Sequence, residues 1–145
     1  MPTYIIYVEP DKGAMQIILR KNPSFLPYEI TATTDPTVEP AEIAGSDLIL
    51  LGGWFANPYT KKYFVDTGII TYDADRMYGP GVYANGKRCI STTVRANGTT
   101  VTAVFGWLAM DTIYAVMDFV SVPLAVLLPA LACGGILTSV AVLLH

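Results

Sequence analysis

The sequence predicts an α/β fold, a small mixed sheet with flanking helices, followed by a C-terminal apolar helix that spans a membrane. Strand-like runs alternate with helical stretches through the first part of the chain, as in α/β domains. Residues 47–51 (DLILL) are continuously apolar after the aspartate, which is typical of a strand at the centre of a parallel sheet. Residues 119–144 then form 26 consecutive positions without a charged side chain. We therefore expect an α/β domain over residues 1–120 and a membrane or assembly anchor over residues 121–145.

The first 44 residues predict two strands, with a helix between them and a loop after them. Residues 4–8 (YIIYV) and 28–33 (YEITAT) are rich in β-branched and aromatic residues, which favours strands. Residues 11–19 repeat apolar side chains at helical spacing and predict a short helix. Two prolines within residues 35–44 limit that segment to a loop or a single helical turn.

A helix is expected soon after the central strand. Asn57 has a side chain suited to capping a helix, and Pro58 suits the first helical position. The sequence therefore predicts a helix from Pro58 through about residue 65. Residues 69–72 have the composition of a further strand.

The last elements of the domain are a hairpin and a helix. Residues 87–95 and 99–105 are strand-like and flank Ala96-Asn97-Gly98, and Asn-Gly favours tight hairpin turns. Residues 109–120 predict an amphipathic helix. The side chains of this helix expected to face the core are Ile113, Val116, Met117 and Val120.

Composition and charge exclude several classes of function. The formal net charge is −3, and no basic cluster exceeds two adjacent residues, so we expect no nucleic-acid partner. The one histidine, His145, leaves no Ser-His-Asp, Cys-His or histidine–metal site. Asp73 and Asp75 form a pair too common to indicate a metal ion. Gly52-Gly53 lacks the spacing of a nucleotide-binding loop and indicates a structural turn. We expect no enzyme and no cofactor.

The uncharged stretch predicts an anchor. As a helix it would reach about 39 Å, and a bilayer core about 30 Å thick needs roughly 20 apolar residues. Its helix-breaking residues are tolerated inside a membrane, where neighbouring helices satisfy the backbone. They are Pro123, Pro129, Gly134 and Gly135.

Two alternatives to a single membrane helix stay open. One is a helix buried at the centre of a soluble oligomer. The other is a hairpin of two membrane helices over residues 100–121 and 122–144, which the β-branched run at residues 101–105 disfavours. The first residues lack the basic and apolar regions of a secretory signal peptide, so we expect none.

Two features have both a functional and a structural interpretation. Asn97-Gly98-Thr99 matches the N-glycosylation sequon, which makes Asn97 a glycosylation candidate, and it also makes a good hairpin turn. The loops at residues 52–59 and 73–86 are rich in aromatic side chains, which suit contacts with a protein or glycan but equally suit packing. The candidate contact residues are Trp54, Phe55, Tyr59, Tyr78 and Tyr83.

Two segments carry a resemblance to a known family. In residues 46–64 (SDLILLGGWFANPYTKKYF) a hydrophobic strand runs into Gly-Gly, and an asparagine then opens a helix. In residues 101–120 (VTAVFGWLAMDTIYAVMDFV) a strand ends in Gly-Trp, and a helix follows with an Asp-Thr pair. Both segments resemble archaeal S-layer proteins, and together they cover about 40 of the 145 residues. The resemblance implies an α/β domain that serves in envelope or surface assemblies rather than in catalysis.

These observations lead to three functional hypotheses. The first is a structural protein of an archaeal cell envelope or virion, an S-layer-like domain anchored by its apolar helix. Its partners would be a lipid membrane and copies of itself or other envelope or capsid proteins, as a homo-oligomer. The second is a membrane-tethered binding module that recognises a protein or glycan through the two aromatic loops. The third is a small enzyme that uses a nucleotide at Gly52-Gly53, for which we expect no bound nucleotide.

Overall fold

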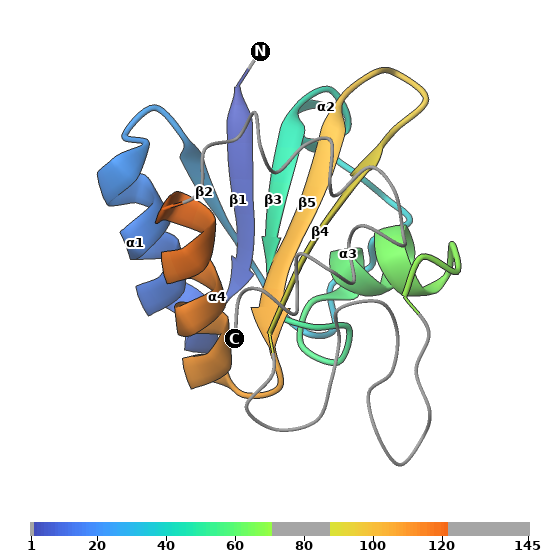
Figure 1. Cartoon of the computed structure of the whole chain (residues 1–145). Helices are drawn as coiled ribbons and strands as arrows, with labels where there is room; N and C mark the ends of the chain where they lie inside the picture. The colour runs from blue at the N-terminus through green and yellow to red at the C-terminus, as the bar shows by residue number, and fades with distance from the viewer. Residues whose placement is uncertain (1, 71–87, 122–145) are drawn as a thin grey trace.

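A computed structural model describes residues 2–70 and 88–121 of the chain, and Figure 1 shows their arrangement. Five strands form one sheet: β1 (Thr3–Val8), β2 (Leu26–Ile30), β3 (Asp47–Leu51), β4 (Arg88–Val94) and β5 (Thr100–Gly106). The two longer helices are α1 (Lys12–Lys21) and α4 (Ala109–Ser121). The short helical segments are η1 (Glu9–Asp11), α2 (Ala41–Ala44), α3 (Pro58–Thr60) and the π-helical turn η2 (Lys61–Val65).

The sheet is mixed, which confirms the predicted α/β class. Its strand order is β2-β1-β3-β5-β4, with the first four strands parallel and β4 antiparallel to β5. The apolar run DLILL forms β3, which pairs with β1 on one side and β5 on the other. The prediction of a central parallel strand is therefore confirmed.

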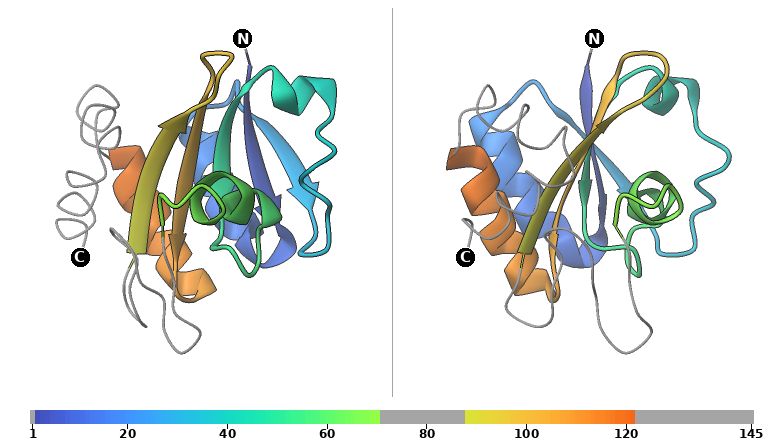
Figure 2. Two further views of the ribbon diagram at one scale, coloured as in Figure 1. Left: turned by 90° about the vertical axis from the view of Figure 1, so that its right-hand side faces the viewer. Right: turned by 45° about the vertical axis from the view of Figure 1, so that its right-hand side comes forward.

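Helices cover both faces of this sheet. Figures 1 and 2 show α1 and α4 side by side on one face, and α2, α3 and η2 on the other. Because side chains alternate along a strand, each central strand supplies both layers. In β3, Ile49 packs beneath α1 and α4, whereas Leu48 and Leu50 join the opposite layer.

Local signals in the sequence explain several element boundaries. The backbone N–H of Tyr59 donates to Asn57 Oδ1 at 3.0 Å, so the predicted cap before Pro58 is confirmed. The predicted hairpin is also confirmed, since β4 and β5 pair around residues 95–99. Gly98 in that turn has φ +85°, a left-handed conformation that favours glycine.

Two predictions about these elements are wrong, and one alternative that the sequence disfavoured is excluded. Met117 is 51% exposed, because α4 buries the side that carries Thr112, Ala115 and Val116. Residues 69–70 form a bend instead of a strand, and the N–H of Ile70 donates back to Phe64 O at 2.7 Å. Residues 100–106 form β5, which excludes a membrane helix over residues 100–121.

Within residues 2–70 and 88–121, no helix combines the length and apolar character required to cross a bilayer. The predicted C-terminal helix, with Pro123, Pro129, Gly134 and Gly135, lies outside the described residues. So does the whole loop at residues 73–86.

Candidate functional site

The carboxyl edge of the sheet is the first place to look for a ligand site. In open α/β sheets, ligands bind outside the carboxyl ends of the strands where neighbouring connections leave in opposite directions. Here that point lies between β1 and β3. The chain leads from β1 to β2 on one side of this point, and the strands after β3 in the sequence, β4 and β5, lie on the other side. The arrowheads of both strands lie at the lower edge of the sheet in Figure 1.

The side chain of Asn57 fills this position. Its Nδ2 donates to Ile6 O at 3.2 Å and to Leu51 O at 2.9 Å, which ties the ends of β1 and β3 together. Its Oδ1 caps α3, and the residue is fully buried. Next to it, Thr60 Oγ1 donates to Gly52 O at 2.8 Å. These polar groups are therefore used to hold the loop and are not presented to a ligand.

Asp11 lies at the same edge but, unlike Asn57 and Thr60, does not bind the backbone of the loop through its side chain. It follows β1, is 5% exposed, and makes no side-chain hydrogen bond to any residue that the structure describes. Its Oδ2 would lie only 2.8 Å from a Cβ on Gly52, where φ is +99°. Burial raises the pKa of Asp11 to about 6, so its charge changes near neutral pH.

The described part of the chain offers no further ligands with which Asp11 could hold a metal ion. No group of three His, Cys, Asp or Glu side chains gathers within residues 2–70 and 88–121. Burial also raises the pKa of the Cys89 thiol well above its usual range, which keeps that thiol in its unreactive protonated form.

The connection from β5 to α4 lies at the same edge and contains the Gly-Trp and Asp-Thr pairs noted in the sequence. The N–H of Gly106 donates to Thr112 Oγ1 at 3.1 Å, and the N–H of Leu108 donates to Asp111 Oδ2 at 3.1 Å. Gly106 has no room for a side chain, because a Cβ there would lie 2.2 Å from the Cβ of Asp111. The Gly-Trp and Asp-Thr pairs thus form a compact connection between strand and helix.

The aromatic candidates divide between core and surface. Trp54 and Tyr59 are 4% and 1% exposed, and the Trp54 ring meets Phe105 edge-on with centroids 5.9 Å apart. Their burial favours packing over partner contacts. Phe55 is 70% exposed and remains a candidate contact residue. Tyr78 and Tyr83 lie outside the described residues.

Asn97 is exposed, but both ends of its amide are in use. Its Nδ2 donates to Ala44 O at 2.8 Å. Its Oδ1 accepts from the backbone N–H of Thr99 at 3.0 Å and from the Thr99 hydroxyl at 2.6 Å. The sequon is therefore an ordered turn in the folded domain, and glycosylation of Asn97 stays a prediction.

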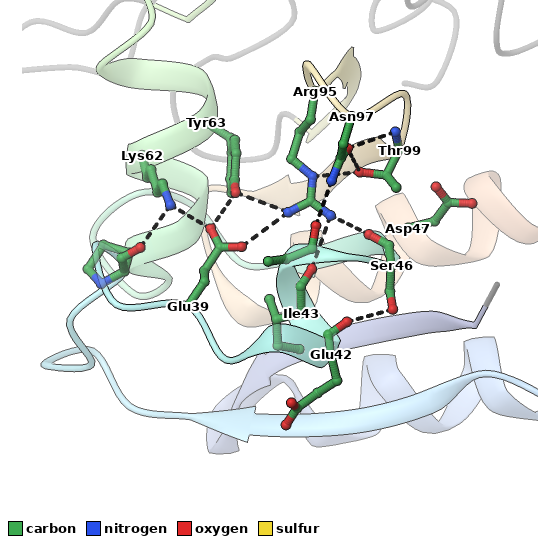
Figure 3. A network of polar contacts seen from close by, with 12 residues as sticks. Glu39, Glu42, Ile43, Ser46, Asp47, Lys62, Tyr63, Arg95, Asn97 and Thr99 are labelled. Atoms are coloured by element: carbon green, nitrogen blue, oxygen red, sulfur yellow. Dashed lines mark hydrogen bonds and ion pairs between the residues drawn. The ribbon is translucent and has the colours of Figure 1, made fainter.

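A polar network that sequence reasoning missed holds this turn against the opposite layer (Figure 3). Arg95 donates to Glu39 Oε1 at 3.1 Å, to Ile43 O at 3.0 Å and to Ser46 O. The side chains of Glu39 and Arg95 are only 9% and 10% exposed. Arg95 thus fastens the hairpin to the segment before β3.

Glu39 is the acceptor at the centre of this network. It also accepts from Lys62 Nζ and from the hydroxyl of Tyr63. Burial, followed by the hydrogen bond to Glu39, raises the pKa of Tyr63, so its hydroxyl stays protonated and donates. Glu39 pairs with two cations, and both cations also bind backbone carbonyls, which identifies a structural cluster. No local pattern in the sequence indicates it, because Glu39 and Arg95 are 56 residues apart.

Comparison with known proteins adds no family assignment: no protein-family model matches this chain, and no curated protein matches its sequence.

Proposed function

We propose that this chain is a structural protein of an archaeal cell envelope or virus particle. In this role an S-layer-like α/β domain is held at a membrane by the apolar C-terminal segment and assembles with copies of itself or with other envelope or capsid proteins. The role requires no catalysis and no cofactor.

The observation that carries the proposal is the run of 26 uncharged residues from 119 to 144. A soluble domain rarely contains so long a run, whereas about 20 apolar residues suffice to cross a bilayer as a helix. The polar groups at the carboxyl edge of the sheet support the same role. Asn57, Thr60 and Thr112 bind the protein's own backbone, as expected of a rigid building block.

Membrane fractionation of the full chain tests the proposal. We expect the chain to float with membranes, to resist extraction by high salt and alkaline carbonate, and to dissolve in detergent. Leu131→Arg places a charge near the middle of the uncharged run, which costs about 3 kcal/mol at the centre of a membrane helix. This variant should lose most of its membrane association.

Val38→Arg is the matched control, because Val38 is 74% exposed in the domain and the same charge there meets water. It should float like the unchanged chain. A full-length chain that stays soluble and monomeric without detergent would contradict the proposal.

A membrane-tethered binding module remains the second candidate. It is favoured by Phe55, an exposed aromatic side chain in the loop after β3. If this loop contacts a protein or glycan, Phe55→Ala should weaken binding to envelope components at least tenfold without altering the unfolding midpoint. Unchanged binding would show that the loop after β3 does not contact a partner through Phe55.

A further inference from the structure

Helix α4 presents an apolar outer face to the surroundings. Met110, Tyr114 and Met117 recur at helical spacing and are 53%, 45% and 51% exposed. Trp107 and Leu108, just before the helix, extend the patch at 38% and 54% exposure. Contiguous apolar patches of this kind mark interaction sites on soluble domains.

The exposed residues of this outer face carry no charge, and the one cation that borders it is Arg88, whose guanidinium lies 5.8 Å from the centroid of the Tyr114 ring. The exposed positions between residues 107 and 121 are all uncharged: Trp107, Leu108, Ala109, Met110, Tyr114, Met117 and Ser121. The two carboxylates of α4 are only partly exposed and are hydrogen-bonded, since Asp111 Oδ2 accepts from the N–H of Leu108 at 3.1 Å and Asp118 Oδ2 accepts from Arg88 Nε at 2.7 Å. A helix that faces water normally carries charged residues on that side.

The chain that follows identifies what covers the face. Helix α4 ends at Ser121, and the next 24 residues contain no charged side chain. On the function proposed above, this segment enters a bilayer, so the end of α4 lies at the membrane surface. The interfacial layer on each side of the hydrocarbon core is about 5–8 Å thick.

The orientation of α4 decides which side chains reach that layer. At 1.5 Å per residue, Met117 lies about 6 Å from Ser121 along the axis, and Trp107 lies about 21 Å away. An upright helix would bring only Met117 into the interface and would leave the rest of the apolar face in water. A helix lying along the surface brings the whole face into contact with lipid.

We propose that α4 lies flat on the membrane, with its outer face in the interfacial layer and lipid as its occupant; the inference rests on the proposed membrane anchoring. Trp and Tyr side chains favour this depth because they combine an apolar ring with a polar group. The exposed residues of the face include no lysine or arginine, and the bordering Arg88 is paired with Asp118, so the contact is hydrophobic and requires no anionic lipid. The opposite layer, with α2, α3 and η2, then points away from the membrane (Figure 2).

Tryptophan quenching tests this orientation on the full chain. The chain has two tryptophans; Trp54 is buried in the domain, so lipid-borne quenching reports on Trp107. The chain is reconstituted in phosphatidylcholine vesicles that contain lipids brominated either near the headgroup or deep in the acyl chains. We expect at least a twofold loss of Trp107 emission with shallow bromines, a smaller loss with deep ones, and little change with salt. Trp107→Phe should abolish the quenching.

A reporter on the other side of the sheet serves as the matched control. Val38→Trp in the Trp107→Phe chain should show no quenching, because Val38 is exposed and its neighbours Pro36 and Glu39 bind Lys62 of η2, on the other face of the sheet. If the chain floats with the vesicles but Trp107 is not quenched, the flat orientation is overturned while the anchoring proposal stands. If the chain does not float, both fail.

A second copy of the chain is the competing occupant of this face. Met110→Cys in a Cys133→Ser background would form disulfide-linked dimers in high yield if two α4 faces met. Such dimers, together with unquenched Trp107, would overturn the assignment to lipid. Met110→Glu should reduce the Trp107 quenching at least twofold, whereas Val38→Glu, at an exposed position on the other side of the sheet, should leave it unchanged.

Discussion

Replacing Gly106 by alanine should destabilise the domain strongly, because this residue ends β5 where α4 packs closest to the strand. A Cβ at Gly106 would lie 2.2 Å from Asp111 Cβ and 2.7 Å from its carbonyl carbon. Carbon atoms in contact are normally 3.5–4.0 Å apart, so the first turn of α4 must move by more than about 1 Å. Since part of the obstacle is backbone, a rotamer change of Asp111 cannot relieve the clash.

The cost has two parts. Overpacking in a well-packed region costs about 1–3 kcal/mol. Movement of α4 also lengthens the bond from Gly106 N to Thr112 Oγ1, and a buried polar group left without its partner costs about 1–3 kcal/mol. We therefore expect Gly106→Ala to lower the free energy of unfolding by about 2–6 kcal/mol, a large part of the 5–15 kcal/mol typical of a domain.

Urea unfolding of the full chain in a mild detergent, followed by far-ultraviolet circular dichroism, measures this loss. Gly13→Ala is the matched control, because Gly13 lies in α1 and a Cβ there would have no neighbour within 4 Å. Alanine suits a helix better than glycine by up to about 1 kcal/mol, so this variant should be unchanged or slightly more stable. A loss below 1 kcal/mol for Gly106→Ala would refute the reasoning from the close approach of α4.

Three further predictions concern buried polar groups. Glu39→Gln removes the anion that pairs with Arg95 and Lys62, and it should lower the free energy of unfolding by about 3–5 kcal/mol. Asp66→Asn breaks an exposed ion pair and should lower it by less than about 1 kcal/mol in the same urea titration. Asp11→Asn should raise the free energy of unfolding at pH 7, because the folded pKa of Asp11, about 6, exceeds its unfolded value of 3.8. Ionisation of Asp11 therefore disfavours folding by about 3 kcal/mol above pH 6 and by little below pH 4. Unfolding curves of this variant should lose the fall in stability that the unchanged chain shows between pH 4 and 6; an identical pH profile would contradict the assignment. Asn57→Ala removes a helix cap and leaves two strand-end carbonyls unpaired, so the midpoint of thermal unfolding should fall by more than 5 °C.

The candidate site was predictable only in part. Gly52 adopts the left-handed conformation of a turn, with φ +99°, and Asn57 caps the helix that its sequence position indicates. Asn57 has a second role, since its Nδ2 also donates to Ile6 O in β1. This bond depends on a strand 51 residues away in the sequence. The same holds for burial: Trp54 follows two glycines in a loop and still packs into the core.

The sequence by itself determined the features that depend on neighbouring residues. The apolar run of β3, the hairpin around Asn97-Gly98 and the capped start of α3 follow from side-chain pattern and turn chemistry over a few positions. The uncharged run that begins in α4 is equally a property of the sequence alone, and it underlies the proposed anchoring.

Tertiary structure alone decided which groups from distant segments meet. Three features arise only when segments far apart in the sequence come together in the fold. They are the order of the strands, the pairing of Glu39 with Arg95 and the burial of Asp11. The outward direction of Met117 was likewise decided by packing, because an apolar helix face offers the sheet several nearly equivalent rotations. The sheet selected the rotation that buries the small Ala115 and Val116, since these allow α4 to approach β5 closely at Gly106.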